Sequence, residues 1–585
     1  MLPAADPTVD PAAGTAFADL VARTFAELKE PVLVLSADTP PDDSEAVERP
    51  VSTLVVARDP AELRRLVTGL VTRVGQTPRS RVVALLLAES PGVVPLVTRP
   101  GWAGLVGLDA RTTPSGGAVT IARFSARVPT GEVLAALARA CALPVTAGND
   151  GVFAALAPGA AVPPADLTAT TSYDAGAKTP PEVWVGGDPD GPLEESPVTG
   201  RAPVVVTESG DLAVGPIDEA VFNPHGFRPD WSERVVGLDP DRPLTSGLVR
   251  DLRAHQGVRV TWPADPRTVA GLAMSGVPLV AEPPPAETRA ALGDAVTAAL
   301  AAPVDLDHPL RREEHSVRLR RSALTAHSTL AWRGRLAARA GARHAAYPSV
   351  SVVLATRRPD LLDFAVHQVA KQRVALPGAE VELVLAAHGW SPDLARVAEL
   401  FGGRAHTVLT FAPDAVFGDV LRAATDAASG DVVVKMDDDD WYGPDVLTDL
   451  LLARRYSGAT LVGMPAEFVY LQPIDTTVRR RGASEAFGTF TAGGTTMVDR
   501  SVLRGVGGFR RVSAHVDLQL FGSVLAAGGT IYRSHGLGYA LRRTSSGHTW
   551  ETGLGYFLSR KSLVHQWHGF RPSQLLEHDA WEAPR

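Results

Sequence analysis

Four apolar segments separated by stretches of helical spacing constrain the fold of this 585-residue chain more than any other feature. The strand-like segments are 350–354, 381–385, 407–411 and 431–435, and the helical stretches between them are 361–371, 393–401 and 416–428. Strands that a parallel sheet buries on both faces read as near-continuous apolar runs. The alternation therefore predicts an α/β domain with a mostly parallel sheet.

Four consecutive carboxylates, Asp437 to Asp440, follow the last strand-like segment and precede a Gly-Pro turn signal. We call them the acidic tetrad. Along an extended segment, Asp437 and Asp439 should project to one side, and Asp438 and Asp440 to the other. Crowded like charges are relieved by raised pKa values or by a cation. Because Mg²⁺ is usually held by one or two carboxylates plus substrate phosphates, we predict a metal that holds a diphosphate. A solvated acidic loop is the alternative, which the apolar strand before the tetrad disfavours.

Other polar side chains stand where the first two strands end. Thr356, Arg357 and Arg358 follow the first strand, and His388 follows the second. In open parallel sheets, ligands bind outside the carboxyl ends of the strands. Arginine suits phosphate by its charge and its fork of N–H groups. These residues, with Asp437 and Asp438, are therefore predicted to bind a phosphate-bearing ligand.

An ordered set of motifs is similar to that of family 2 glycosyltransferases with the GT-A fold, a Rossmann-like and mostly parallel sheet. The resemblance covers residues 348 to about 550. It rests on Pro348–Arg358, Gly418–Asp431, the tetrad with Trp441–Pro444, Gly493–Met497 and Val506–Phe509. The resemblance implies transfer of a sugar from a nucleotide-sugar donor, with inversion at the anomeric carbon and with Mn²⁺ or Mg²⁺.

The resemblance also assigns residues. Asp437 and Asp439 would form the family's D-x-D metal site, with Asp439 as the direct ligand. Asp517, at the start of a helical stretch, would be the base that deprotonates the acceptor hydroxyl. A helix N-cap is the alternative role for Asp517.

Further contacts are implied downstream. Arg543 and His548 would contact the diphosphate. The acceptor side would include Gly493, Gly494, Thr495 and Trp550, although Trp550 is equally explained as a core residue. One departure concerns the base of the nucleotide. Family members that bind uridine often have Asp where this chain has Ala387, so the nucleotide is left open.

The rest of the sequence predicts domain boundaries, but it indicates no function for the first half of the chain. We expect a loose segment at 1–15, an α/β region at 16–285 with a break near 110–180, and a basic helical linker at 286–346. The glycosyltransferase domain would span 347–570, followed by a tail at 571–585. The basic segment 311–343 is either a surface that contacts anionic lipid or, as we favour, a linker helix.

The composition limits which binding partners we expect for this protein. The net charge of −8 gives no reason to expect nucleic acid. No window reaches about 18 uncharged apolar residues, which predicts a cytoplasmic protein, with contact at the inner face of a membrane only through the basic segment. The predicted activity is glycosyl transfer to a cell-surface glycan, a lipid-linked sugar or a small molecule. The alternatives are a nucleotidyltransferase and a non-catalytic sugar- or nucleotide-binding module.

Overall fold

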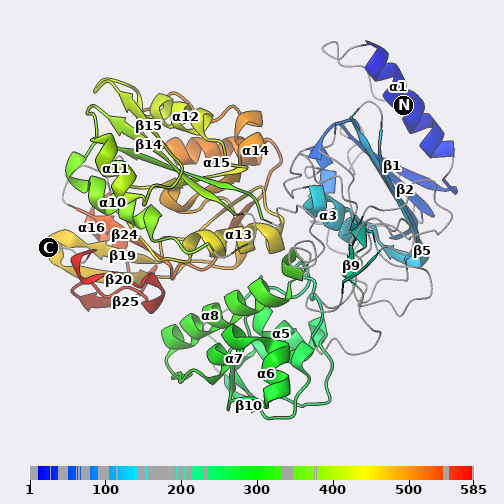
Figure 1. Cartoon of the computed structure of the whole chain (residues 1–585), viewed down its shortest axis with the longest axis horizontal. Coiled ribbons are helices and arrows are strands. Elements are labelled where there is room, and N and C mark those ends of the chain that lie inside the picture. The colour runs from blue at the N-terminus through cyan, green and yellow to red at the C-terminus, as the bar shows by residue number, and fades with distance from the viewer. Residues whose placement is uncertain are drawn as a thin grey trace. The chain divides into compact units, whose positions relative to one another are not determined.

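The computed structural model describes most of the chain. The described residues are 11–36 without 27, most of 50–141, short strands between 153 and 205, and 214–582 without 228–232, 329, 333–346, 375, 377–378 and 545–551. The chain forms two compact units (Figure 1). The first consists of residues 1–221 and 327–346, and the second of residues 222–326 and 347–585. The observed division therefore differs from the expected plan, in which 286–346 was a separate linker.

The first unit contains a five-stranded sheet in the order β1-β2-β3-β5-β4. Strands β1 to β3 are parallel, whereas β5 pairs antiparallel with β3 and β4. Parallel pairing in this sheet is thus confined to one side. The elements in this part of the chain are α1 (Pro11–Ala26), β1 (Val32–Leu35), β2 (Ser52–Ala57), β3 (Arg79–Leu87), β4 (Leu105–Thr112), β5 (Ala118–Pro129) and α3 (Thr130–Cys141). Two further pairs of short strands follow: β6 (Phe153–Ala154) pairs with β7 (Val183–Trp184), and β8 (Leu193–Glu195) pairs with β9 (Pro203–Val205).

The second unit begins with a small α/β layer whose three strands, β10-β11-β12, are parallel. Local sequence explains its helices: Asp265 accepts hydrogen bonds from the N–H groups of Arg267 and Thr268, and Pro266 occupies the first turn. The elements are β10 (Glu233–Gly237), α4 (Ser246–Arg253), β11 (His255–Val260), α5 (Pro266–Met274), β12 (Leu279–Ala281), α6 (Ala286–Leu292), α7 (Asp294–Ala301) and α8 (Pro309–His327).

The principal sheet of the second unit has eight strands in the order β15-β14-β13-β16-β22-β18-β23-β21. The four strands on the β15 side are parallel, which confirms the predicted α/β class and mostly parallel sheet. The elements that build this half are β13 (Val350–Thr356), α10 (Leu362–Ala370), β14 (Val381–His388), α11 (Leu394–Leu400), β15 (His406–Phe411), α12 (Phe417–Ala427) and β16 (Val432–Met436).

The remaining elements complete this sheet and add a second one in the order β17-β24-β19-β20-β25. They are β17 (Trp441–Tyr442), α13 (Val446–Ser457), β18 (Leu461–Gly463), β19 (Phe468–Leu471), β20 (Thr476–Arg480), β21 (Ala486–Gly488), β22 (Met497–Asp499), α14 (Arg500–Gly505), α15 (Val516–Ala526), β23 (Ile531–Arg533), β24 (Tyr539–Arg543), α16 (Leu554–Phe557) and β25 (Leu563–His568). Short 3₁₀ turns lie at Pro359–Leu361, Gln472–Ile474, Gly493–Thr495, Gln574–Leu576 and Ala580–Glu582.

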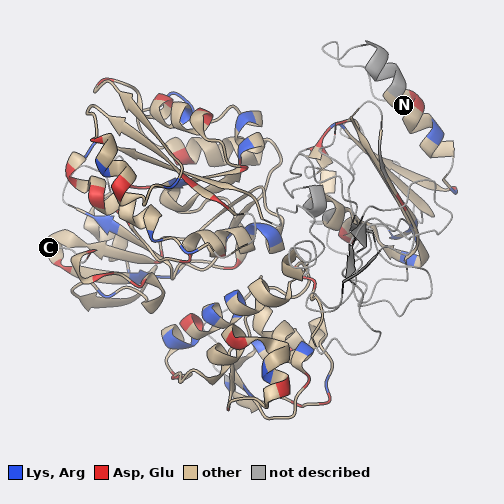
Figure 2. Ribbon diagram, viewed as in Figure 1, with Lys and Arg blue, Asp and Glu red and all other residues tan. Residues whose placement is uncertain are grey.

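Helix α8 carries the first part of the basic segment, and it is a packed helix rather than a basic surface. Basic and acidic residues both occur along it (Figure 2). Arg320 is 4% exposed and pairs with Glu485, and Arg321 pairs with Asp445 and Asp449 at 2.8 and 2.7 Å. The charges of Arg320 and Arg321 are therefore paired with carboxylates of the same unit. This pairing does not support lipid contact by the described part of the segment. The later arginines, from Arg333 onward, lie outside the described residues.

The C-terminal residues, expected as a tail, also pack into the second unit. Leu575 and Leu576 are buried in a cluster with Trp441. The Trp441 indole N–H donates to the Glu582 carbonyl at 2.8 Å. In the described part of the chain, no helix has the length and apolar character needed to cross a membrane.

Candidate active site

The carboxyl ends of three neighbouring strands lie at one edge of the principal sheet. β13 pairs in parallel with β14, so that Thr356 stands opposite Ala387, and with β16, so that Leu354 stands opposite Met436. The next residues along each strand therefore emerge at the same edge. This register brings together most of the residues that the sequence marked as phosphate-binding.

Arg358 links the first strand to the acidic tetrad. Its Nε donates to Asp438 at 3.1 Å, its Nη2 also pairs with Asp438, and its Nη1 donates to Asp439 at 2.9 Å. The Thr356 hydroxyl donates to Asp438 as well. Asp438 and Asp439 thus share one arginine, so the alternation expected for an extended chain fails. The physical reason is that residues 438–440 form a bend rather than a strand.

Lys435 links the tetrad to Asp517. Its ammonium lies 2.7 Å from Asp437 and 3.3 Å from Asp517, and the lysine side chain is only 5% exposed. Burial disfavours this charge, but the two carboxylates outweigh burial and raise the pKa of Lys435. Lys435 is therefore a fixed positive charge between two carboxylates that come from different elements.

Asp517 lies in the first turn of α15, but it does not cap the helix. The N-cap residue is His515, with φ of 59°, and no side chain makes a capping bond there. Burial raises the pKa of Asp517, Lys435 lowers it and the Asp437 charge raises it again, with a net upward shift. Its side chain is 24% exposed, and its Oδ1 has no hydrogen-bond partner among the described residues. This carboxylate is held in place, yet one oxygen is left uncompensated.

Gly493 and Gly494 lie directly beside the carboxylates of Asp517 and Asp437. A Cβ on Gly493 would lie 2.1 Å from Asp517 Oδ2, and one on Gly494 would lie 2.8 Å from Asp437 Oδ2. The hydroxyl of Tyr442 fixes the same contact, because it accepts from the Asp437 N–H and donates to the Gly494 carbonyl, both at 2.8 Å. The glycine pair leaves space that any side chain would fill.

Asp440 has a different environment from the other members of the tetrad. It is 1% exposed, accepts from the Arg542 N–H at 2.8 Å, and also accepts from the Tyr539 hydroxyl. Burial, with the charges of Asp439 and Asp437, raises the pKa of Asp440 well above its ordinary range. Asp440 thus anchors β24 to the tetrad from within the core.

His388 and Arg357 form a pair at the end of β14. The Arg357 Nε donates to His388 Nδ1 at 3.0 Å, and its Nη2 lies 2.8 Å from His388 Nε2. Burial and the Arg357 charge lower the pKa of His388, so the ring accepts as a neutral imidazole. The position where uridine-binding enzymes often carry Asp, Ala387, is buried in the sheet.

The remaining predicted residues are placed less centrally. Arg543 is buried at the end of β24. Burial lowers the pKa of its guanidinium, and this effect outweighs the charges of Asp439 and Asp440, which raise that pKa. The Thr495 hydroxyl bonds to the Met464 and Ala492 carbonyls and so serves the backbone. His548 and Trp550 lie outside the described residues.

Two residues at the centre of the site, Lys435 and Tyr442, were not predicted to have a role. Lys435 carried a signal, because a lysine within an apolar strand shares a face with the residue two positions later, here Asp437. Tyr442 carried no such signal, since its partner Gly494 is 52 residues away.

The carboxylates fit a divalent cation. Asp437 and Asp439 offer oxygen ligands, which Mg²⁺ and Mn²⁺ prefer. Burial raises the pKa of Asp439, Arg358 lowers it and the Asp437 charge raises it, with a net upward shift that a bound cation would relieve. The unpartnered oxygen of Asp517 adds to this excess of acceptors. Asp437 and Asp439 are the residues that would hold the metal.

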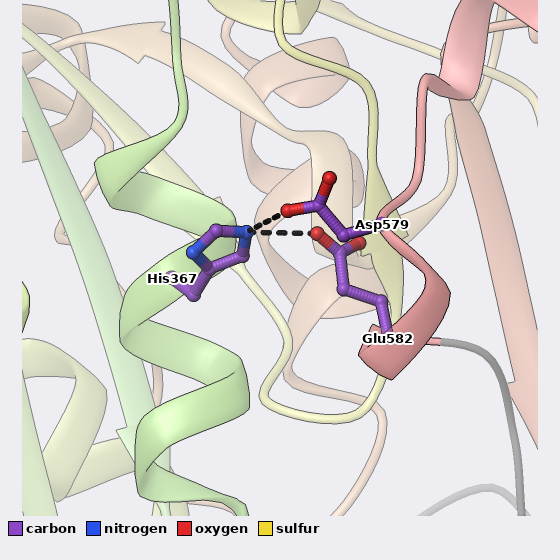
Figure 3. A group of neighbouring side chains, drawn as sticks. All are labelled: His367, Asp579 and Glu582. Carbon is purple, nitrogen blue, oxygen red and sulfur yellow. Dashed lines mark hydrogen bonds and ion pairs between the residues drawn. The ribbon is translucent and has the colours of Figure 1, made fainter.

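A second cluster of metal-ligand type is formed by His367 of α10 with Asp579 and Glu582 of the C-terminal segment (Figure 3). Ligand atoms of the three lie within 4.8 Å of one another. However, the Lys371 ammonium lies 2.8 Å from Glu582, which also accepts from His367 at 2.8 Å. Because a cation already neutralises Glu582, this cluster fastens the C-terminal segment to α10.

Comparisons with known proteins give structural likeness only. No family model matches the chain, and no curated protein matches it. Among solved structures, a mannosyltransferase, PcManGT from Pyrobaculum calidifontis, in complex with GDP-Man and Mn²⁺, matches with 16% identity and a TM-score of 0.27, over 34% of this chain and 59% of that chain. S. aureus TarS matches with 14% identity and a TM-score of 0.27, over 33% of this chain and 37% of that chain. A TarS fragment, residues 1–349 with UDP-GlcNAc, matches with 14% identity and a TM-score of 0.28, over 34% and 60%. The match thus spans three-fifths or less of these chains.

Proposed function

We propose that this protein is an inverting, metal-dependent glycosyltransferase of the GT-A, family 2-like type. It would move a sugar from a nucleotide-sugar donor to a hydroxyl of a glycan, a lipid-linked sugar or a small molecule. The observation that carries the proposal is the Lys435 bridge. It joins the acidic tetrad at the end of β16 to Asp517 of α15. This bridge would hold a donor site and a base site side by side.

Each residue has a role that its contacts support. Asp437 and Asp439 would hold the metal, which would stabilise charge on the leaving nucleoside diphosphate. Arg358 and Arg357, at the end of β13, would bind phosphate oxygens. Asp517, whose side chain is 24% exposed, would take the proton from the acceptor hydroxyl. Lys435 would hold Asp517 and Asp437 in place by bridging them, and Gly493 would leave room for the acceptor above Asp517.

Calorimetry with UDP, GDP, CDP and dTDP, with and without Mn²⁺, tests the donor site. We expect one nucleotide to bind only when Mn²⁺ is present, and we expect Asp439→Ala to lose that binding. Asp426→Ala, which removes an exposed carboxylate of α12 outside the tetrad, is the matched control and should bind as wild type. Binding of no nucleotide in the presence of Mn²⁺ would overturn the proposed donor site. Binding that persists in Asp439→Ala would overturn the assignment of the metal ligand.

A further inference from the structure

We propose that Arg358 is an internal counter-ion that occupies Asp439 in the ligand-free protein and gives way to the metal only when the donor arrives. The inference rests on the proposed function, because it concerns the same metal and diphosphate. It adds an order of binding: metal and nucleotide would bind together, and metal alone would bind weakly.

The contacts of Arg358 divide into a fixed part and an exchangeable part. Its Nε and Nη2 both engage Asp438, which the Thr356 hydroxyl also holds. These contacts keep the guanidinium in place. By contrast, Nη1 makes one bond, to Asp439 at 2.9 Å. Loss of that bond would remove the arginine from Asp439 while the arginine stays anchored on Asp438.

Electrostatics gives the exchange its direction. A divalent ion on Asp439 would lie within a few ångström of the guanidinium, so the two cations repel each other. A diphosphate carries negative charge that attracts both cations, and the Nη1 group that leaves Asp439 could donate to a phosphate oxygen. The Arg358 side chain is 31% exposed, so a ligand can reach it. The diphosphate would therefore convert Arg358 from a competitor of the metal into a second ligand-binding group.

Manganese binding to the full chain tests this inference without any measure of turnover. Free Mn²⁺ is followed by electron paramagnetic resonance during titration of wild type, first alone and then with saturating UDP or GDP. For Arg358→Gln, we expect the affinity for Mn²⁺ alone to rise about tenfold, because one repelling charge is removed. We also expect the gain in Mn²⁺ affinity on adding nucleotide to fall about tenfold, since the two ligands are then less strongly coupled.

Matched variants separate the possible outcomes. Arg396→Gln removes the same charge from an exposed pair, with Asp363 at 2.6 Å, and should bind Mn²⁺ as wild type. Arg358→Lys keeps the charge but loses the fork, and should bind Mn²⁺ alone with an affinity between those of wild type and Arg358→Gln. If Arg358→Gln does not fold, Arg358→Lys decides the matter, and an unchanged affinity overturns the inference.

Asp439→Asn distinguishes failure of this inference from failure of the proposed function. If Asp439→Asn loses Mn²⁺ while Arg358→Gln gains no affinity, the metal site stands and the counter-ion role of Arg358 is wrong. If Asp439→Asn binds Mn²⁺ as wild type does, or if no variant binds Mn²⁺ with or without nucleotide, both proposals are overturned.

Discussion

Two groups of buried carboxylates in the second unit differ in the direction in which their pKa values are shifted. Where α8 packs, Asp449 accepts two bonds from Arg321 and one from His535, all within 2.9 Å. Burial opposes its charge, but Arg321 and His535 outweigh burial and lower the pKa of Asp449. In the tetrad, the pKa values of Asp438 and Asp439 are raised although Arg358 contacts both. A lowered pKa is typical of a carboxylate whose charge the fold itself compensates, whereas a raised pKa marks a carboxylate that a bound cation could still compensate.

The largest expected effect on activity is that of Asp517→Asn. The substitution removes the only group we assign as base, so transfer should fall about 10²- to 10⁴-fold. Donor binding and the melting temperature should stay near wild type, because the partly exposed Asp517 is paired only through Lys435 among its described contacts. Steady-state transfer assays and calorimetry with Mn²⁺ and nucleotide measure the two effects. Near-normal transfer would refute the base assignment.

Glu485→Gln should have the largest effect on stability. Glu485 is 1% exposed, pairs with Arg320 and accepts from the hydroxyls of Tyr456 and Tyr532 at 2.7 and 3.0 Å. Loss of one partner of a buried ion pair leaves the other charge uncompensated, which costs about 3 kcal/mol. Urea unfolding measures the change. The exposed pair variant Asp363→Asn is the control, with an expected loss of less than about 0.5 kcal/mol.

Gly493→Ala should lower activity more than stability. The added Cβ would lie 2.1 Å from Asp517 Oδ2, so the carboxylate would have to leave the position in which Lys435 holds it. We expect transfer to fall about tenfold, since a small displacement of a catalytic group is costly, while the melting temperature changes little. Gly505→Ala, whose Cβ would meet nothing within 4 Å, should leave transfer unchanged. Equal transfer by both variants would mean that the space above Asp517 is not used.

Glu582→Gln should have the smallest effect, and that effect should depend on pH. Burial would raise the pKa of Glu582, but His367 and Lys371 outweigh it and lower the pKa to about 2. The folded pKa is thus below the unfolded value of about 4.3, so the carboxylate stabilises the fold above pH 4.3 and this contribution is lost as pH falls through about 2. We expect wild type to be more stable than Glu582→Gln by about 1 kcal/mol at pH 7. Thermal melts from pH 7 to pH 3 should show this difference shrinking, and a constant difference would contradict the assignment.

The parts of the fold that the sequence predicted best are the strands that read as near-continuous apolar runs. Strands buried on both faces, such as β13 and β16, were located to within two residues because most of their positions are apolar. The tetrad was recognised as a site, but its geometry was not predicted, because side-chain alternation holds only in an extended segment and residues 438–440 bend.

Counting charges along the sequence predicted the surroundings of the arginines least well. The arginines of α8 left two interpretations open, a basic surface or the linker helix that we favoured, because the carboxylates that neutralise them are distant in sequence. Arg320 and Glu485, for example, are 165 residues apart. The role of Gly493 was similarly hidden, since the motif gives its position but not the contact with Asp517 that explains it.

The interleaved composition of the two units has a consequence for protein synthesis. Residues 222–326 leave the ribosome before 327–346, yet the former belong to the second unit and the latter to the first. While it is being made, α8 has no access to Asp445, Asp449 or Glu485, which are translated more than a hundred residues later. The order of translation and the order of assembly therefore differ, and Arg320 and Arg321 lack these carboxylate partners until most of the chain exists. A fragment cut after residue 346 would separate α8 permanently from its partners.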